Sequence, residues 1–360
     1  MSKNLILTIN PGSTSLKIGI FEAISADNIR EIFVSKQAYP KESLDNAKSV
    51  IDLLPVAQSA VEKLIIDSGI DTTDLVAVAG RGGLMRPLSG GTYTVNEKML
   101  EDLRTLRYGK HASNLGAILA DIIAKPLNLP AFIVNPVVVD EMDDIARLSG
   151  HPLFTRKSAF HALNQKSIAQ KAAKQLNKSY NELNMIIAHI GGGISVAAHM
   201  NGRVVDVNNG LEEGPFSPER TGNIPVLQLV ELCFSGKYQK ADIDKMLVGK
   251  GGIMGYLGTS DLTEVSKLRN NGDKDAKQVF EAMAYQISKE IAANSAVLFG
   301  KVDAIVLTGG AAYSNSLVGL ITERVSHIAQ VMVFPGENEL YALAEGAYSV
   351  VSGTEQAKVY

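Results

Sequence analysis

Short apolar runs alternate with amphipathic stretches along most of the chain. Residues 5–9 are apolar and mostly β-branched, residues 17–21 are apolar after Lys17, and the turn residues Asn10-Pro11-Gly12-Ser13 lie between the two runs. This pattern predicts a strand, a turn and a second strand. In the same half of the chain, further patterns predict helices at 49–67 and 115–125 and buried strands at 75–79 and 131–134.

The second half of the chain repeats this organisation. A predicted strand at 185–190 runs into Gly191-Gly192-Gly193, and Asn201-Gly202 is a strong hairpin signal. The remaining predicted elements are strands at 194–199, 203–207, 302–307 and 330–334 and helices at 162–176, 278–298 and 340–351. Two halves that each begin with strand, glycine loop and strand predict an α/β protein of two related domains with a cleft between them.

Composition narrows the class of protein. A chain of 360 residues favours two domains, and a formal net charge of −3 gives no general attraction to nucleic acid or acidic membranes. The single cysteine, Cys233, excludes an intramolecular disulfide. Residues 1–4 lead directly into a predicted strand without the features of a signal peptide, and no run of about 20 apolar residues occurs. We therefore expect a soluble, cytoplasmic protein.

Three glycine-containing loops each follow a predicted strand: residues 10–17, 189–195 and 308–312. Their backbone N–H groups, the hydroxyl groups of the first loop and Lys17 suit an anion such as a phosphate. The alternatives are a solvated β-turn, a strained turn and a tight strand-to-helix turn, respectively. Because strand ends meet at one edge of a sheet, three such loops together favour a ligand site.

Other phosphate or metal motifs are missing from the sequence. No Gly-Lys pair is followed by Ser or Thr, and no G-x-G-x-x-G is present, which excludes a Walker A loop and the usual dinucleotide fingerprint. The absence of H-E-x-x-H and C-x-x-C argues against a zinc site built by the protein.

Polar residues beside these loops are candidates for the same site. For each of Arg81, His111, His161 and Arg220 taken alone, a surface or structural role is the more common one. Four cationic or titratable groups next to predicted strand ends nevertheless favour an anionic ligand. Glu337 and Glu339 follow the last strand and suit Mg²⁺, although a charged first helical turn explains them equally well.

Seven ordered motifs resemble those of the acetate and butyrate kinase family, most closely its butyrate and branched-chain carboxylate kinases. They are INPGSTSLKIGIFE, GRGGLMRP, GKHASNLGA, FHALNQKSIA, AHIGGGIS, NNGLEEGPFSPERTG and VLTGGAAYSN. The resemblance implies two duplicated domains of the actin, sugar kinase and heat-shock chaperone ATPase type. It also implies ATP and Mg²⁺ as cofactors, a homodimer or larger homo-oligomer, and reversible transfer of phosphate from ATP to a short-chain carboxylate. In cells such enzymes often make ATP from butyryl phosphate during fermentation.

The resemblance also implies roles for individual residues. Asn10, Ser13, Ser15 and Lys17 match a first phosphate loop, and His189 with Gly191, Gly192 and Gly193 match a second, where acetate kinases have an Asn at position 192. His111, His161 and Arg220 match groups near the transferring phosphoryl group. Gly309 and Gly310 match the adenosine site, and Glu339, with Asn10, the Mg²⁺ site. The implied domains are 1–137 completed by 340–360, and 138–339 as the nucleotide-binding domain.

Two departures from the family pattern leave alternatives open. Arg81 is shifted next to the glycines, so Arg81 and Arg86 compete as the arginine that binds the substrate carboxylate. Asn135 stands where acetate kinases carry an aspartate, so that Asp140 or Glu141 is a possible substitute. Three functions remain open: a butyrate kinase, an acetate or propionate kinase, and a non-catalytic nucleotide-binding protein of the actin type.

Overall fold

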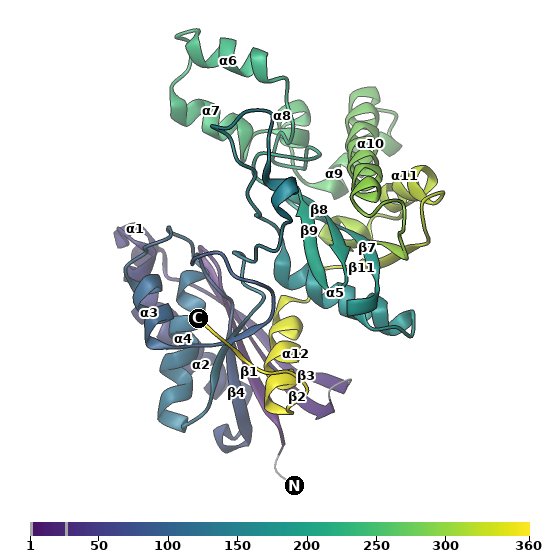
Figure 1. The fold of residues 1–360 in the computed structure, drawn as a ribbon. Helices are drawn as coiled ribbons and strands as arrows, with labels where there is room; N and C mark the ends of the chain where they lie inside the picture. Colours follow the sequence, from purple (N-terminus) through teal and green to yellow (C-terminus); the bar gives the residue numbers. More distant parts are fainter. Residues whose placement is uncertain (1–2, 26–27) are drawn as a thin grey trace. The chain divides into compact units, whose positions relative to one another are not determined.

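The computed structural model describes residues 3–25 and 28–360 (Figure 1). Contacts within the chain divide it into two compact units. Unit 1 consists of residues 1–139 and 338–360, and unit 2 of residues 140–337.

Unit 1 is built on a seven-stranded mixed sheet in the order β12-β5-β6-β4-β1-β2-β3. β1 pairs antiparallel with β2 and parallel with β4. The strands are β1 Leu5–Pro11, β2 Ser15–Ser25, β3 Asn28–Ala38, β4 Leu75–Gly80, β5 Thr92–Thr94, β6 Ala131–Val134 and β12 Lys358–Val359.

Helices cover both faces of the unit 1 sheet. Leu5, Leu7 and Ile9 point to one face and form a core with α2 and α4. Ile6 and its cross-strand partner Phe21 point to the other face, where the Phe21 ring contacts Tyr341 of α12. The helices of the unit are α1 Lys41–Asn46, α2 Leu54–Ser68, α3 Glu97–Arg104, α4 Asn114–Ala124 and α12 Glu339–Val351, with 3₁₀ turns η1 Val50–Leu53, η2 Thr72–Asp74 and η3 Lys125–Leu127.

Unit 2 contains a five-stranded sheet in the order β11-β10-β7-β8-β9. β7 pairs antiparallel with β8 and parallel with β10. The strands are β7 Asn184–Ile190, β8 Ile194–Met200, β9 Arg203–Val207, β10 Ala304–Gly309 and β11 Val331–Pro335.

Successive residues of β7 again serve two cores. Ile186, Ala188 and Ile190 pack with α10 and α11, whereas Met185 and Ile187 pack with α5. The helices are α5 Ala162–Gln175, α6 Val226–Phe234, α7 Lys240–Leu247, α8 Gly252–Leu257, α9 Leu262–Asn270, α10 Lys274–Val297 and α11 Asn315–Val325, with 3₁₀ turns η4 Asp144–Arg147, η5 Tyr180–Glu182 and η6 Gly310–Tyr313.

The two sheets share one topology. Strands β3-β2-β1-β4-β6 of unit 1 and β9-β8-β7-β10-β11 of unit 2 have the same sequence of antiparallel and parallel pairings. This confirms the expected duplication. The glycine loops at 12–14 and 191–193 therefore occupy the same place, the first hairpin turn of each sheet. Among the described residues, no helix is long and apolar enough to cross a membrane.

Candidate active site

The first hairpin turn of unit 1 carries an exposed lysine. The Gly12 N–H donates to the Ser15 carbonyl oxygen at 2.7 Å and closes the turn. Asn10 and Lys17 are directly opposite one another on β1 and β2, so their side chains lie on the same face of the sheet. Across residues 3–25 and 28–360, the Lys17 ammonium group has no ion-pair partner, and the hydroxyl-bearing Ser13 is also exposed.

Arg81 lies beside Asn10 and Glu339, although the three are far apart in sequence. The Arg81 backbone N–H donates to the Ile9 carbonyl oxygen at 2.9 Å, which holds the residue at the end of β4. Its Nη1 donates to Glu339 Oε2 at 3.0 Å and to Asn10 Oδ1 at 3.3 Å. Asn10 Nδ2 donates to the same Glu339 oxygen at 2.6 Å. The predicted first phosphate loop therefore shares a polar cluster with the first residue of α12.

His111 precedes α4 and accepts a hydrogen bond on one ring nitrogen. The Ser113 backbone N–H donates to His111 Nδ1 at 3.2 Å, and the Ser113 hydroxyl lies 2.7 Å from the same nitrogen. Although the residue as a whole is exposed, loss of solvent around its ring and, secondly, the charge of Arg81 lower its pKa. His111 is thus biased toward the neutral ring, with Nε2 as donor.

Arg86, the rival of Arg81, has a different environment. Its guanidinium lies over the Tyr360 ring, 4.7 Å from the ring centroid. The Tyr360 hydroxyl in turn donates to Asp102 Oδ2 at 2.8 Å. Arg86 is therefore part of the packing of the last residue of the chain, whereas Arg81 is part of the cluster with Asn10.

Asn135 has a structural role after β6. Its φ of 37° is in the left-handed region, which asparagine tolerates better than most residues. Its Oδ1 accepts from the Gly91 N–H at 2.7 Å, and its own N–H donates to the Gly91 carbonyl oxygen at 3.0 Å. The side chain links β6 to the backbone before β5.

The two carboxylates considered as substitutes for an aspartate at 135 both have cationic partners. Asp140 accepts from both terminal nitrogens of Arg147 at 2.7 Å each. Glu141 lies 2.7 Å from Lys166 Nζ, and both side chains are more than 90% buried. These ion pairs give both carboxylates structural partners, so they do not support the predicted substitution.

The triple-glycine turn of unit 2 is shaped by close approach of other groups. Its closing hydrogen bond joins the Gly191 N–H and the Gly193 carbonyl oxygen at 3.0 Å. None of the three glycines has a φ in the left-handed region. A Cβ on Gly193 would instead lie 2.3 Å from Arg220 Nη1, and one on Gly191 would lie 3.3 Å from His189 Nε2. At Gly192 the nearest atom would be 3.7 Å away.

Arg220 is held against this turn by two further contacts. Its Nη1 donates to the Gly210 carbonyl oxygen at 2.7 Å. Its backbone N–H donates to the Ser217 hydroxyl at 3.1 Å, and that hydroxyl donates to the Gly192 carbonyl oxygen at 2.6 Å. Burial lowers the pKa of Arg220 from its ordinary value, and the neighbouring Glu219 partly offsets this. The guanidinium remains a cation with few protein partners for its donors.

His161, which immediately precedes α5, is oriented by a buried serine. Its Nδ1 lies 2.9 Å from the Ser195 hydroxyl oxygen. Gln165 Nε2 donates to that hydroxyl at 2.9 Å and to the Ser195 carbonyl oxygen at 3.0 Å. The Ser195 hydroxyl thus lies between Gln165 and His161 Nδ1 and fixes the orientation of the His161 ring.

The orientation of Gln165 is set by a second buried histidine. Gln165 Oε1 accepts from His199 Nε2 at 3.0 Å, and His199 Nδ1 accepts from the Tyr180 hydroxyl at 2.7 Å. Complete burial and, secondly, the charge of Lys166 lower the pKa of His199 well below its ordinary value. A neutral His199 thus maintains the chain of hydrogen bonds that ends at His161.

His189 stacks on His161 with 3.8 Å between the ring centroids and 13° between the ring planes. Its Nδ1 lies 2.8 Å from Asn164 Oδ1 and its Nε2 lies 3.0 Å from Glu337 Oε1. Oxygen atoms at both ring nitrogens fix the orientation of His189. The triple-glycine turn thus has His189 beside Gly191 and Arg220 beside Gly193.

The third glycine loop has one constrained and one open position. Gly309 has a φ of 91°, and a Cβ there would lie 2.4 Å from the Ile190 carbonyl oxygen. Gly310 begins η6, is exposed, and has no atom within 4 Å of a built Cβ. The loop therefore presents exposed backbone at Gly310, whereas Gly309 packs against Ile190.

Asn10 and Glu339 are the residues that suit a magnesium ion. No group of three or more His, Cys, Asp or Glu residues able to hold a metal occurs in the described part of the chain. Mg²⁺ is usually bound by one or two carboxylates together with water and substrate phosphates. Asn10 and Arg81 both donate to Glu339 Oε2, and Arg81 also donates to Asn10 Oδ1 at 3.3 Å. An ion that arrives with a nucleotide would bind Glu339 Oε1, or would displace Arg81 from Glu339 Oε2 and Asn10 Oδ1.

The duplicated sheets and the bare glycine turns define an α/β ATPase fold of the actin, sugar kinase and heat-shock chaperone type. The model of the acetokinase family matches residues 147–360, more than half of the chain, and the chain belongs to this family. It is therefore a phosphotransferase with a carboxyl group as acceptor, and family membership implies the use of ATP and Mg²⁺.

Solved structures confirm the fold. The acetate kinase of Porphyromonas gingivalis has a TM-score of 0.76 at 19% identity, over 97% of this chain and all of that one. A propionate kinase of Francisella tularensis subsp. tularensis SCHU S4 has a TM-score of 0.68 at 21% identity, over 95% and 98%. The acetate kinase of Entamoeba histolytica has a TM-score of 0.72 at 18% identity, over 96% and 99%.

Two residues around His161 were missed by the sequence analysis. Ser195 is the last residue of the motif AHIGGGIS, but only the structure shows that its hydroxyl lies 2.9 Å from His161 Nδ1. Gln165 follows His161 by four positions, and its backbone N–H donates to the His161 carbonyl oxygen at 2.9 Å in the first turn of α5. That spacing was a usable signal.

Proposed function

We propose that this protein phosphorylates butyrate or a branched short-chain carboxylate with ATP, reversibly and by direct in-line transfer, giving the acyl phosphate and ADP. A carboxylate oxygen attacks the γ-phosphorus atom while the bond from that phosphorus to the ADP oxygen breaks. The substrate carboxyl has a pKa of about 4–5, like side-chain carboxyls, and is ionised at neutral pH. The reaction therefore needs no general base, and the obstacle is repulsion between two anions.

The observation that carries this proposal is the position of Arg220 against Gly193. A Cβ built on Gly193 would lie 2.3 Å from Arg220 Nη1. The Arg220 guanidinium is therefore held at the backbone of a glycine turn that suits phosphate. Fixed cations of this kind supply most of the catalysis in phosphoryl transfer. A protein that only binds nucleotide has no need for it.

The other residues of unit 2 have complementary roles in the proposal. His161 would donate from Nε2 to the moving phosphoryl group, since Ser195 engages its Nδ1 at 2.9 Å. His189 and residues 191–193 would bind the nucleotide phosphates. Gly309 and Gly310 would leave room for the adenosine.

Unit 1 would supply a second set of groups. Arg81 would bind the substrate carboxylate, and Asn10, Ser13, Ser15 and Lys17 would bind phosphate. His111, whose lowered pKa favours the neutral ring, would donate from Nε2 to the phosphoryl group. Asn10 and Glu339 would hold Mg²⁺, which when bound neutralises charge on the nucleotide phosphates.

A coupled assay that traps the acyl phosphate as its hydroxamate tests the proposal over straight and branched C2 to C6 acids. The highest kcat/KM is expected with butyrate or a branched analogue. A maximum at acetate or propionate would assign the chain to those specificities. The assay is needed because one methylene group changes binding in a pocket by only about 1–3 kcal/mol. Nucleotide binding without hydroxamate from any acid would indicate a non-catalytic protein of the actin type. The homodimer or larger oligomer stays a prediction.

A further inference from the structure

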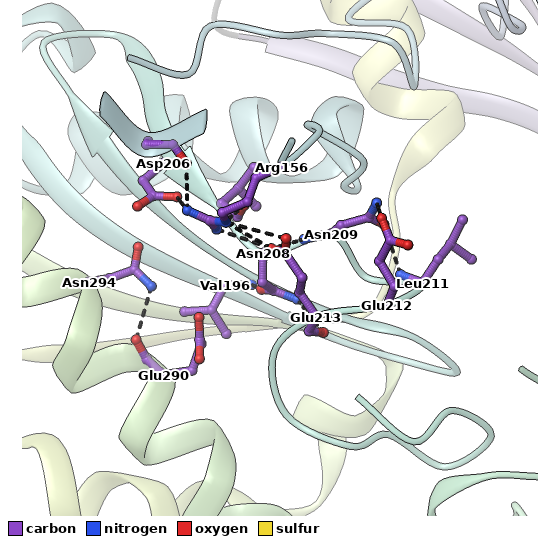
Figure 2. A network of polar contacts seen from close by, with 12 residues as sticks. Arg156, Val196, Asp206, Asn208, Asn209, Leu211, Glu212, Glu213, Glu290 and Asn294 are labelled. Atoms are coloured by element: carbon purple, nitrogen blue, oxygen red, sulfur yellow. Dashed lines mark hydrogen bonds and ion pairs between the residues drawn. The ribbon is translucent and has the colours of Figure 1, made fainter. Parts of the chain in front are cut away.

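Arg156 is the centre of a polar network in unit 2 that the resemblance to known kinases did not single out (Figure 2). Its Nε and Nη2 donate to Glu213 at 3.1 to 3.3 Å, and its Nη1 donates to Asp206 Oδ1 at 3.0 Å. The guanidinium also donates to the carbonyl oxygens of Ala146 at 2.8 Å and Val207 at 3.1 Å. All three nitrogens of the guanidinium are thus used, and the side chain is 25% exposed.

The partner Glu213 closes a short loop, residues 208–213, that follows β9. Its carboxylate accepts from the Asn209 backbone N–H at 3.2 Å, and its own N–H donates to the Asn209 carbonyl oxygen at 2.8 Å. Asn208 ties the start of the loop to β8, since its Oδ1 accepts from the Val196 N–H at 2.6 Å. Figure 2 shows these contacts side by side with those of Arg156. Both ends of the loop are fixed.

The middle of the loop is the peptide that contacts Arg220. The Gly210 N–H donates to the Ala159 carbonyl oxygen at 3.1 Å, and the Gly210 carbonyl oxygen accepts from Arg220 Nη1 at 2.7 Å. Ala159 lies two residues before His161 and three after Arg156. The segment that carries His161 and the guanidinium of Arg220 are therefore joined through one residue of the loop.

We propose that Arg156 is a positioning residue for Arg220. It acts through Glu213, which fixes the loop so that the Gly210 carbonyl oxygen holds the Arg220 guanidinium against Gly193. A lysine cannot replace it, because one ammonium group cannot serve two carboxylates and two carbonyl oxygens in a planar fork. The inference rests on the proposed role of Arg220 in catalysis.

The first test is the steady-state kinetics of Arg156→Lys and Glu213→Gln in the full-length protein. Each variant should lose about 10- to 100-fold in kcat, the cost of a small misplacement of a catalytic group, with KM for ATP and acid changed less than about threefold. Arg203→Lys is the matched control. Arg203 also joins a carboxylate, Asp143, to a carbonyl oxygen, and it has no contact with residues 208–213. It should keep kcat within about twofold of the wild type.

A double-mutant comparison separates positioning from a general structural role. In an Arg220→Ala background, adding Arg156→Lys should cost less than about twofold, because the group that it positions is gone. A full, additive loss there, or an unchanged kcat in Arg156→Lys with the fold intact, would overturn the proposal. If Arg156→Lys does not fold, Glu213→Gln takes its place in the same comparison.

A readout without catalysis keeps this inference distinct from the proposed function. Hydrogen exchange of residues 208–214 should be faster in Arg156→Lys and Glu213→Gln than in the wild type and in Arg203→Lys. Faster exchange in a protein that phosphorylates no acid would contradict the proposed function but would support the inference that Arg156 and Glu213 fix the loop. Unchanged exchange in both variants would contradict the inference that Arg156 and Glu213 fix the loop, whatever the activity.

Discussion

The guanidinium of Arg220 occupies the space that a side chain at Gly193 would need. With 2.3 Å between a built Cβ and Nη1, any residue larger than glycine at 193 would force the Arg220 guanidinium to move. The third glycine of the turn is therefore explained by a side chain of the protein itself, and not by backbone conformation or by ligand alone.

The first prediction is that Gly193→Ala displaces Arg220 and lowers kcat by about 10²-fold or more, the scale expected for a misplaced catalytic group. Gly192→Ala is the comparison within the same turn, since its Cβ would meet nothing closer than 3.7 Å. It should lose clearly less kcat. Equal losses in the two variants, measured by the hydroxamate assay with thermal unfolding as the check on folding, would argue against the steric explanation.

The second prediction concerns the two cationic candidates of unit 2. Arg220→Ala should lower kcat by about 10³-fold or more, as removal of an arginine from a phosphoryl-transfer site does. His161→Ala should also depress kcat, and circular dichroism should show an intact fold in both. Near-normal turnover in either variant would remove that residue from the mechanism.

The third prediction decides between Arg81 and Arg86 as the substrate arginine. Arg81 contacts Asn10 and Glu339, whereas Arg86 lies over the ring of Tyr360. Arg81→Lys should raise KM for the carboxylate by about tenfold or more, because a lysine lacks the bidentate fork. Arg86→Lys should leave that KM near the wild-type value. The measurement is the rate as a function of acid concentration. A raised KM in Arg86→Lys with an unchanged KM in Arg81→Lys would identify Arg86 as the substrate arginine.

The fourth prediction is a loss of stability in mild acid. The pKa of His199 in the folded protein is well below its ordinary value, and that of His111 is also lowered. Above the unfolded pKa of about 6.5 neither group binds a proton in either state. As the pH falls below that value the unfolded chain binds protons first. The free energy of unfolding should then fall by up to about 1.4 kcal/mol per pH unit for the buried His199, and by less for the exposed His111, where solvent screens the effect.

Urea unfolding between pH 7 and pH 5 measures this dependence. His199→Gln should lower the free energy of unfolding at pH 7 and should flatten its decline toward pH 5. Replacing the exposed His327 by glutamine is the control and should keep the wild-type slope. A wild-type slope in His199→Gln would show that the acid sensitivity arises elsewhere.

Much of the architecture was predictable from local patterns. The strand, glycine turn and strand at the start of each half were visible because buried strands are continuous apolar runs and hairpin turns need glycine and asparagine. Their repetition predicted the duplicated sheets that the topology shows. By contrast, β3 and α6 were not predicted. β3 is mostly exposed, and its sequence does not alternate regularly between apolar and polar residues. The sequence of α6 is largely apolar, although none of its residues is buried.

Local sequence by itself determined the glycine turns, most of the buried strands and the residue types suited to an anion. The tertiary structure alone decided which of these residues meet. It placed Glu339 beside Asn10, 329 positions away, gave Asn135 a backbone partner, and provided Asp140 and Glu141 with cations. It also showed that Gly193 makes room for Arg220. The physical reason is that periodicity and turn chemistry act between near neighbours, whereas ion pairs and close backbone approaches form between residues that only the completed sheets bring together.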